Sequence, residues 1–295
     1  MNKVKCASVS IIGRPSSGKS TLVNTICEMK VSITAASPQT TRNAIRGIYT
    51  DQRGQIIFTD TPGYHLSDKV FNQRMKDITC EVLNDSDIIL YLIDGTRDVK
   101  KEEEAIAAML KKIKRPIIAV INKMDVAQDV EEIENYLNNE INTVAILKAS
   151  GKNDEGVDDI LIKIFELSPE ADQLMYPEDK YTDQDLEFRI SEIIREKVIS
   201  NLSDEMPHVI FVEIADIEYN EEEKTVWIRA FINVERDGQK GMIVGKEGKN
   251  IKRIRKQSFT EIKRIFPTAS IHLDLRVKSQ SKWRNNSIIL DKIFR

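Results

Sequence analysis

The segment GRPSSGKS at 13–20 has the residue types and the spacing of a phosphate-binding loop. Two glycines separated by four residues let backbone N–H groups turn toward an anion, and a following helix presents the positive end of its dipole. Lys19 can reach the β- and γ-phosphates of a nucleotide, and the Ser20 hydroxyl can ligate Mg²⁺. A glycine turn without a ligand is the alternative. We expect the nucleotide to contact Gly13, Arg14, Pro15, Ser16, Ser17, Gly18, Lys19, Ser20 and Thr21.

The tetrapeptide DTPG is a second candidate phosphate contact, because it ends the apolar run at 55–60. An aspartate at a strand tip near the phosphates can hold Mg²⁺ directly or through water. We expect this role for Asp60, while the Gly63 N–H binds the γ-phosphate and Thr61 and Pro62 complete the loop. DTPG alone is a common turn sequence, so this prediction depends on the loop at 13–20.

The segment NKMD at 122–125 indicates which base is bound. The Asp125 carboxylate can accept hydrogen bonds from the N1–H and N2–H₂ groups of guanine. Adenine lacks both donors, so its binding would leave the carboxylate unpaired. Asn122 can contact the guanine edge, and Lys123 can lie along the face of the base. Together the three motifs predict a GTP-binding protein.

Short apolar runs precede these motifs, at 8–12, 55–60, 87–94, 116–122 and 144–147. Such continuous runs are typical of strands buried on both faces of a parallel sheet. Helical candidates, such as 100–113, lie between them. The first 165 or so residues therefore predict a doubly wound α/β domain with its motifs at the strand tips.

The second part of the chain has a different pattern and a different charge. The segment 168–186 contains Pro169, Pro177 and several acidic residues, which indicates a linker. The runs 226–235 and 270–278 then alternate apolar and polar residues, as strands buried on one face do. Residues 236–295 hold 16 Lys and Arg against 5 Asp and Glu, whereas the rest of the chain holds 28 against 42. This asymmetry favours a polyanionic partner, although a solvated basic face is the alternative.

A GxxG turn within this basic part is the candidate contact for that partner. Gly245 and Gly248 precede a helical segment at 249–266 with cations near its first turns. In KH domains, a GxxG turn at a helix N-terminus clamps the sugar-phosphate backbone of single-stranded nucleic acid. We expect Phe259 in the core, and Trp283 against either the RNA or the core. The predicted RNA-binding residues are Gly245, Lys246, Glu247, Gly248, Lys249, Lys252 and Arg253.

The three nucleotide motifs, the QTTR segment at 39–42 and the GxxG half resemble the Era family of GTPases over the whole chain. The resemblance implies an α/β fold class: a P-loop GTPase domain with a mixed, mostly parallel sheet, followed by a smaller α+β type II KH domain. The expected boundaries are 1–168 for the GTP-binding domain, 169–185 for the linker and 186–295 for the KH domain. The strand after QTTR is expected at an edge and antiparallel.

The resemblance also assigns individual residues. Thr41, with Thr40 as the alternative, is expected to ligate Mg²⁺ when the γ-phosphate is present, beside Ser20 and Asp60. Lys19, Thr41 and Gly63 then act on the γ-phosphate. The Ala149 N–H, or that of a residue one or two positions away, is expected to meet guanine O6. Tyr64 stands where many GTPases have a water-orienting Gln, which implies a slow intrinsic rate. Ser16 stands where many relatives have Asn, which leaves dependence on potassium open.

The function that the resemblance implies is a GTP-hydrolysing switch with GTP/GDP and Mg²⁺ as cofactors. Its expected partners are 16S rRNA near the 3′ end and the 30S ribosomal subunit, whose assembly and rRNA processing it serves. We expect a cytoplasmic monomer. The alternative is a membrane-surface switch whose basic domain meets anionic lipid, with weak peripheral association at the inner face of the cell membrane. A phosphotransferase and an RNA chaperone with idle GTP are further alternatives.

Overall fold

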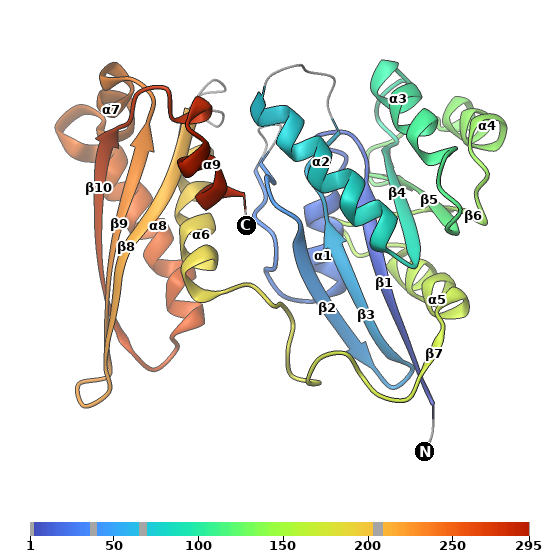
Figure 1. Cartoon of the computed structure of the whole chain (residues 1–295), viewed down its shortest axis with the longest axis horizontal. Coiled ribbons are helices and arrows are strands. Elements are labelled where there is room, and N and C mark those ends of the chain that lie inside the picture. The colour runs from blue at the N-terminus through green and yellow to red at the C-terminus, as the bar shows by residue number, and fades with distance from the viewer. Residues whose placement is uncertain (1–2, 36–39, 65–69, 203–208, 295) are drawn as a thin grey trace. The chain divides into compact units, whose positions relative to one another are not determined.

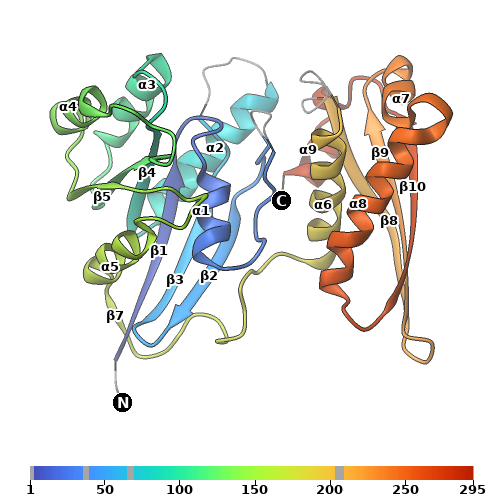
Figure 2. The same ribbon diagram turned by 180° about the vertical axis from the view of Figure 1, so that it is seen from behind.

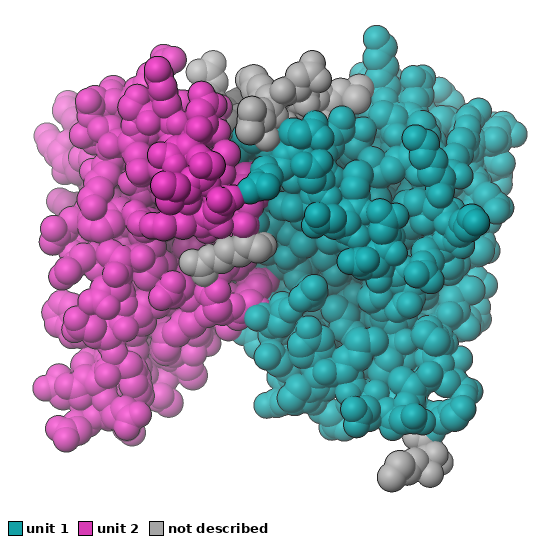
Figure 3. Space-filling model, viewed as in Figure 1, with its two compact units in different colours: residues 1–34, 41–183 teal, residues 35–40, 184–295 magenta. Residues whose placement is uncertain are grey.

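The chain forms two compact units in a computed structural model that describes residues 3–35, 40–64, 70–202 and 209–294. The first unit contains Met1–Thr34 and Thr41–Asp183, and the second contains Ala35–Thr40 and Gln184–Arg295 (Figure 3). The first unit therefore includes most of the segment expected to be a linker. The second unit includes a short piece from the first part of the chain, which no local sequence pattern indicates.

A single sheet organises the first unit, with the strand order β2-β3-β1-β4-β5-β6 (Figure 1). Neighbouring strands are parallel except for β2, which lies at the edge and runs antiparallel to β3, as predicted. A short strand that the sequence did not indicate, β7, pairs with β1. The strands are β1 (Val4–Ile12), β2 (Ile45–Asp51), β3 (Gly54–Asp60), β4 (Ile88–Asp94), β5 (Ile117–Asn122), β6 (Ala145–Lys148) and β7 (Glu170–Ala171).

Helices cover both faces of this sheet, which is why its central strands are apolar throughout. Helices α2, α3 and α4 pack on one face in a common apolar cluster, and α1 and α5 lie on the other (Figures 1 and 2). Strands β3, β4 and β5 are buried along their whole length. The helices are α1 (Lys19–Ile26), α2 (Val70–Asp85), α3 (Lys101–Leu110), α4 (Glu131–Glu140) and α5 (Val157–Leu167).

Residues 169–183 run along the first unit as a bound strap. The strap begins beside β1, where the Cys6 N–H donates to the carbonyl of Pro169 (3.1 Å). It reaches the free edge of β2, where the Ile48 N–H donates to the carbonyl of Tyr181 (2.9 Å) and Arg46 pairs with Asp183 (2.8 Å). An edge strand has unpaired backbone groups along one side. The strap satisfies some of them, so composition alone was not enough to define where the first unit ends.

The second unit has the predicted α+β order, with the GxxG turn between two helices. Its sheet has the order β10-β9-β8, in which β9 is antiparallel to β8 and parallel to β10. The predicted alternation is confirmed, because Val226, Ile228, Ala230 and Ile232 are buried against α6 and α8. The elements are α6 (Leu186–Ser200), β8 (Ile210–Asn220), β9 (Thr225–Val234), α7 (Asp237–Val244), α8 (Lys249–Ile265), β10 (Ser270–Ser279) and α9 (Ser287–Ile293).

Two aromatic residues of the second unit differ in their environment. Trp283 is fully buried, with its ring 4.9 Å from that of Phe211 and its Nε1 donating to the carbonyl of Val209 (3.1 Å). It therefore belongs to the core. Phe259 was predicted to be a core residue, and this is wrong: its side chain lies on the exposed face of α8 and is 40% exposed. The buried face of that helix is formed by Ile254, Ser258 and Ile262 instead.

Candidate functional sites

The P-loop at 13–20 connects β1 to α1, and its glycines lie where no side chain fits. A Cβ atom on Gly13 would lie 2.2 Å from the carbonyl oxygen of Leu92. Gly18 has a φ of 98°, and a Cβ atom there would lie 2.2 Å from Nδ2 of Asn122. Ser16 also has a positive φ, 65°. The loop is therefore folded tightly against β4 and β5.

Lys19 lies inside this loop and is 5% exposed. Its Nζ donates to the carbonyls of Arg14 (2.9 Å) and Gly13 (3.1 Å). Burial lowers the pKa of Lys19 to about 8, although the nearby Asp60 carboxylate partly opposes this shift. A buried cation that donates to neutral carbonyls near one carboxylate is suited to a strongly anionic ligand.

Three oxygen-bearing side chains meet beside Lys19. The Ser20 hydroxyl donates to Oδ2 of Asp60 (2.6 Å) and lies 3.0 Å from the Thr41 hydroxyl, which itself lies 3.4 Å from the same Asp60 oxygen. Asp60 is fully buried, its pKa is raised by burial, and its Oδ1 has no hydrogen-bond partner among the described residues. Hard oxygen ligands with an unpaired buried carboxylate oxygen fit Mg²⁺. The structure brings together the three predicted metal ligands, with Thr41 as the threonine whose hydroxyl lies here.

The DTPG loop lies directly against the P-loop. A Cβ atom on Gly63 would lie 2.7 Å from Cα of Pro15, so only glycine allows this approach. The Thr61 hydroxyl donates to the carbonyl of Ile11 (2.6 Å), and the Tyr64 N–H donates to that of Gly13 (3.1 Å). The Tyr64 side chain is buried in the apolar cluster beneath α2. A largely buried tyrosine therefore stands at the position where many GTPases have the water-orienting Gln.

The NKMD segment follows β5 and is joined to the P-loop. The Asn122 amide donates to the carbonyl of Ser17 (2.8 Å) and accepts from the Gly151 N–H (3.0 Å), so its polar atoms bind protein backbone. Lys123 has a φ of 67° and donates to Oδ2 of Asp94 (2.7 Å). Burial would raise the pKa of Asp94, but the hydrogen bonds from Lys123 and Thr96 lower it. Asp94 was not predicted from the sequence, and it fixes the direction of the Lys123 side chain.

The base-recognition carboxylate and the loop after β6 are also joined. Oδ1 of Asp125 accepts from the hydroxyl of the buried Ser150 (2.8 Å), which orients the carboxylate. The Ala149 N–H donates to the carbonyl of Ile121 (2.9 Å). The sequence-based assignment of this N–H to guanine O6 therefore needs correction, because pairing of β6 with β5 continues for one more residue. The next two N–H groups are paired as well, that of Ser150 with the carbonyl of Glu155 (2.9 Å) and that of Gly151 with Oδ1 of Asn122 (3.0 Å), so each would have to leave its protein partner to meet O6.

The GxxG turn of the second unit has the geometry of a backbone clamp. Gly245 and Gly248 have φ values of 70° and 72°, and Glu247 lies between them with a φ of 55°. A Cβ atom on Gly245 would lie 2.7 Å from Cγ of Asn250, whose amide donates to the carbonyl of Met242 (3.0 Å). The turn leads directly into α8 and leaves its N–H groups at the helix N-terminus.

Cations and apolar side chains surround this turn. The exposed Lys246, Lys252, Arg255 and Lys256 have no carboxylate partner among the described residues, whereas Lys249 lies 3.5 Å from Glu247. Arg253 donates to the carbonyl of Asn201. Met242 and Val244, at the end of α7, are large apolar side chains left exposed beside the turn. Sequence reasoning missed these two, although their position directly before the GxxG turn could have indicated a base-contacting surface.

Comparison with known proteins agrees with both sites. Residues 8–123 match the family model of the 50S ribosome-binding GTPases, and residues 205–284 match that of the KH domains. GTPase Era of Treponema denticola is 43% identical over 289 residues, which cover 97% of this chain and 98% of that protein. The chain belongs to the Era family of GTPases. GTPase Era of Borrelia garinii is 41% identical and covers 98% of this chain and 99% of its own length.

Solved Era structures have the same fold over nearly the whole chain. A crystal structure of Era in complex with MgGDPNP and nucleotides 1506–1542 of 16S rRNA has a TM-score of 0.93 and 31% identity, with 98% of each chain covered. Aquifex aeolicus Era bound to GDP·AlF4⁻ has a TM-score of 0.92, also with 31% identity and 98% coverage of each chain. Membership of the Era family makes this chain a GTPase. Among the described residues, no helix is long and apolar enough to span a membrane.

Proposed function

We propose that this Era-family GTPase is a GTP-hydrolysing switch that binds 16S rRNA near its 3′ end and acts in 30S subunit assembly and rRNA processing. The observation that carries the proposal is one chain with both a guanine-nucleotide site and a basic GxxG domain. The relative solved with MgGDPNP and 16S rRNA nucleotides 1506–1542 covers 98% of this chain, which supports the same pair of ligands here.

The nucleotide site supports GTP and GDP as ligands with Mg²⁺ as the metal. Ser20, Thr41 and Asp60 supply the oxygens, and the ion would neutralise charge on the phosphates. Lys19 and the Gly63 N–H would stabilise the γ-phosphate during hydrolysis. Because Tyr64 is buried, no side chain at that position orients water, which supports a slow intrinsic rate. Asp125 would select guanine, and a backbone N–H of the loop after β6 would meet O6.

The second domain supports single-stranded RNA as the partner. The positive φ angles of Gly245 and Gly248 let the backbone approach a phosphate closely, and Lys246, Lys252 and Arg253 supply positive charge. The exposed Met242 and Val244 offer apolar contact to unstacked bases. We place Glu247 and Lys249 in the same clamp, with their side chains paired to each other.

The course of the chain supports coupling of the two functions. The Mg²⁺ ligand Thr41 belongs to the first unit, and its neighbour Thr40 belongs to the second. Within the second unit, the guanidinium of Arg195 on α6 donates to the Thr40 carbonyl. A γ-phosphate that orders Thr41 therefore acts one peptide bond away from a residue held by the RNA-binding domain. Hydrolysis would release Thr41 from the γ-phosphate and leave the hydrogen bond between Arg195 and the Thr40 carbonyl.

Binding of the full chain to an RNA of nucleotides 1506–1542 tests the proposal, with a scrambled RNA as the control. We expect specific binding that changes at least about threefold between a GTP analogue and GDP, and that weakens steeply with salt. Equal affinity in both nucleotide states would reject the coupling, and equal affinity for both RNAs would reject the rRNA assignment.

A pair of glycine variants tests the clamp itself. Gly248→Asp places a carboxylate where the phosphate would bind, and we expect about tenfold weaker RNA binding, or ~1.4 kcal/mol, with GTP binding unchanged. Gly238→Asp is the matched control, because a Cβ atom on Gly238 has no heavy atom within 4 Å. Equal losses in the two variants would exclude the GxxG turn as the contact.

Cytoplasmic location, a monomeric state and weak peripheral binding to the membrane are part of the same proposal. The basic surplus of residues 236–295 would attract anionic lipid as well as RNA. Flotation with anionic vesicles, with and without competing RNA at equal salt, separates the two ligands. Vesicle binding that RNA does not displace would favour a membrane-surface switch instead.

A further inference from the structure

The side chain of Arg14, in the P-loop, pairs with a buried carboxylate. Its Nη1 donates to both carboxylate oxygens of Glu103, each at 2.9 Å. The Arg14 and Glu103 side chains are 13% and 3% exposed, so water screens this ion pair little. Separating the two side chains would leave each charge buried and uncompensated. The two residues are therefore held in this arrangement.

Glu103 is itself anchored at the beginning of α3. Its Oε2 accepts from the Lys100 N–H (3.2 Å), one of the backbone donors that a helix N-terminus leaves unpaired. The position of the carboxylate is thus set by the helix and not by the P-loop. The adjacent Glu104 has the same side chain and is exposed to solvent.

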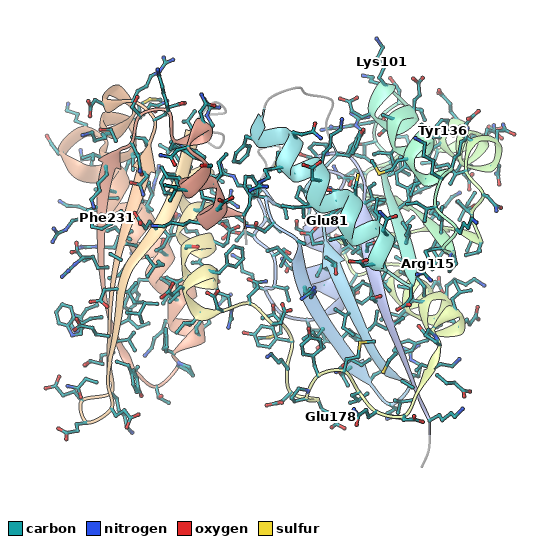
Figure 4. The ribbon with its side chains drawn as sticks, in the orientation of Figure 1. Glu81, Lys101, Arg115, Tyr136, Glu178 and Phe231 are labelled. Carbon is teal, nitrogen blue, oxygen red and sulfur yellow. The ribbon has the colours of Figure 1, made fainter. Side chains whose placement is uncertain are left out.

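Two buried phenols lie near enough to this carboxylate for its charge to affect them. The hydroxyls of Tyr91 on β4 and Tyr136 on α4 are buried and have no hydrogen-bond partner among the described residues. Burial first, and then the charge of Glu103, raises the pKa of both groups, to about 12 for Tyr136. Figure 4 labels Tyr136 on α4, next to α3.

The backbone of Arg14 connects this pair to the nucleotide site. Its carbonyl accepts from Nζ of Lys19 (2.9 Å) and from the Ser17 N–H (3.3 Å). Arg14 therefore holds the Lys19 ammonium group through its backbone carbonyl, while the Arg14 side chain is held by Glu103 on α3. A shift of the guanidinium would shift the carbonyl, and with it the ammonium group that meets the phosphates.

We propose that Glu103 is a positioning residue for nucleotide binding, which acts through Arg14 to fix the carbonyls that hold Lys19. Glu103 does not touch the nucleotide. It keeps the first turn of the P-loop in its binding conformation, so its loss lowers the affinity for any nucleotide that the loop takes up. This proposal rests on the GTPase activity of the family and is independent of the RNA ligand.

The test compares Glu103→Gln with the control Glu104→Gln in the full chain, by equilibrium titration with a fluorescent GDP and a fluorescent GTP analogue. We expect Glu103→Gln to raise both Kd values about tenfold, while the preference for GTP over ATP is kept because Asp125 is untouched. The control is expected to match the wild type. Kd values for Glu103→Gln within about twofold of the wild type at a temperature well below its Tm overturn the proposal.

A second variant and a double variant guard against a purely structural effect. Arg14→Lys keeps a positive charge beside Glu103 but lacks the rigid planar guanidinium and loses conformational freedom in holding the pair, and we expect an intermediate rise in Kd. Because the two residues act as a unit, Arg14→Lys combined with Glu103→Gln is expected to bind no more weakly than the weaker single variant. Additive losses, or an Arg14→Lys variant that folds and binds like the wild type, overturn the proposal.

Discussion

The side-chain amide of Asn122 donates to the carbonyl of Ser17 at 2.8 Å, which joins residues 105 positions apart in the chain. The other end of the same amide accepts from the Gly151 N–H (3.0 Å). One buried side chain thus connects the phosphate loop, the guanine motif and the loop after β6. The three motifs behave as one site because a single amide satisfies groups from all of them.

Asn122→Ala should therefore affect more than base recognition. It leaves the Ser17 carbonyl and the Gly151 N–H without their partner, at a cost of about 1–3 kcal/mol in the free energy of unfolding. Denaturant unfolding of nucleotide-free protein measures this loss. The exposed Asn153 of the adjacent loop provides the control Asn153→Ala, which we expect to change stability by no more than about 0.5 kcal/mol. A stable Asn122→Ala protein would show that the amide is dispensable for the site.

Asp125→Asn should change which base is bound. An amide oxygen in place of one carboxylate oxygen, with an N–H₂ donor beside it, complements xanthine and no longer accepts both guanine donors. We expect GTP affinity to fall about a hundredfold, or ~2.7 kcal/mol, and xanthosine triphosphate to bind better than GTP. Competition titrations with both nucleotides measure this change. Asp154→Asn, in the exposed part of the next loop, should retain the wild-type preference.

The effect of Mg²⁺ removal on nucleotide affinity should depend on the Ser20 hydroxyl. EDTA should weaken binding of a GTP analogue to the wild type about tenfold, and to Ser20→Thr by a similar factor, because threonine keeps the hydroxyl. Ser20→Ala should bind weakly with Mg²⁺ present and respond little to EDTA. If EDTA weakens binding to Ser20→Ala as much as to the wild type, the metal is held by other groups.

Cys27 gives the chain a pH-dependent stability term. Burial raises the pKa of its thiol from 9.0 to about 12. As the pH rises, the thiol of the unfolded chain therefore loses its proton before the thiol of the folded chain does. The contribution of Cys27 to the free energy of unfolding is complete below pH 9, falls between pH 9 and about 12 and is lost above that range. We expect the difference in unfolding free energy between wild type and Cys27→Ala to shrink by about 1 kcal/mol per pH unit in that window. A constant difference from pH 8 to pH 10.5 contradicts this assignment.

Local patterns were enough to find the parts of the site that lie on one segment of chain. The P-loop, DTPG and NKMD are each continuous, and the rules that place strand tips at one edge of a parallel sheet bring them together. The structure agrees, since Ser20, Asp60 and Thr41 lie within hydrogen-bonding distance of one another. The alternation of β9 was equally readable, because one-sided burial leaves a period of two residues.

Contacts between distant segments were not readable in this way. Glu103, Asp94 and Ser150 each orient a site residue from another element, and nothing in their own sequence context marks them. Ala149 was assigned to the base by alignment with the alanine of the family, and its N–H instead continues the pairing of β6 with β5. Phe259 was placed in the core by its residue type alone, although Ser258 holds the buried position. Side-chain direction at a segment boundary depends on pairing with a partner that the sequence does not specify.

The strap along β2 determines where the first unit can be cut. A fragment that ends near residue 168 would remove the carbonyl that accepts from the Ile48 N–H and the carboxylate that pairs with Arg46. The bare strand would then be free to pair with a second molecule, and such a fragment should aggregate on purification. A fragment that ends at Asp183 keeps this edge covered and is the one to express when nucleotide binding is measured without the RNA-binding half.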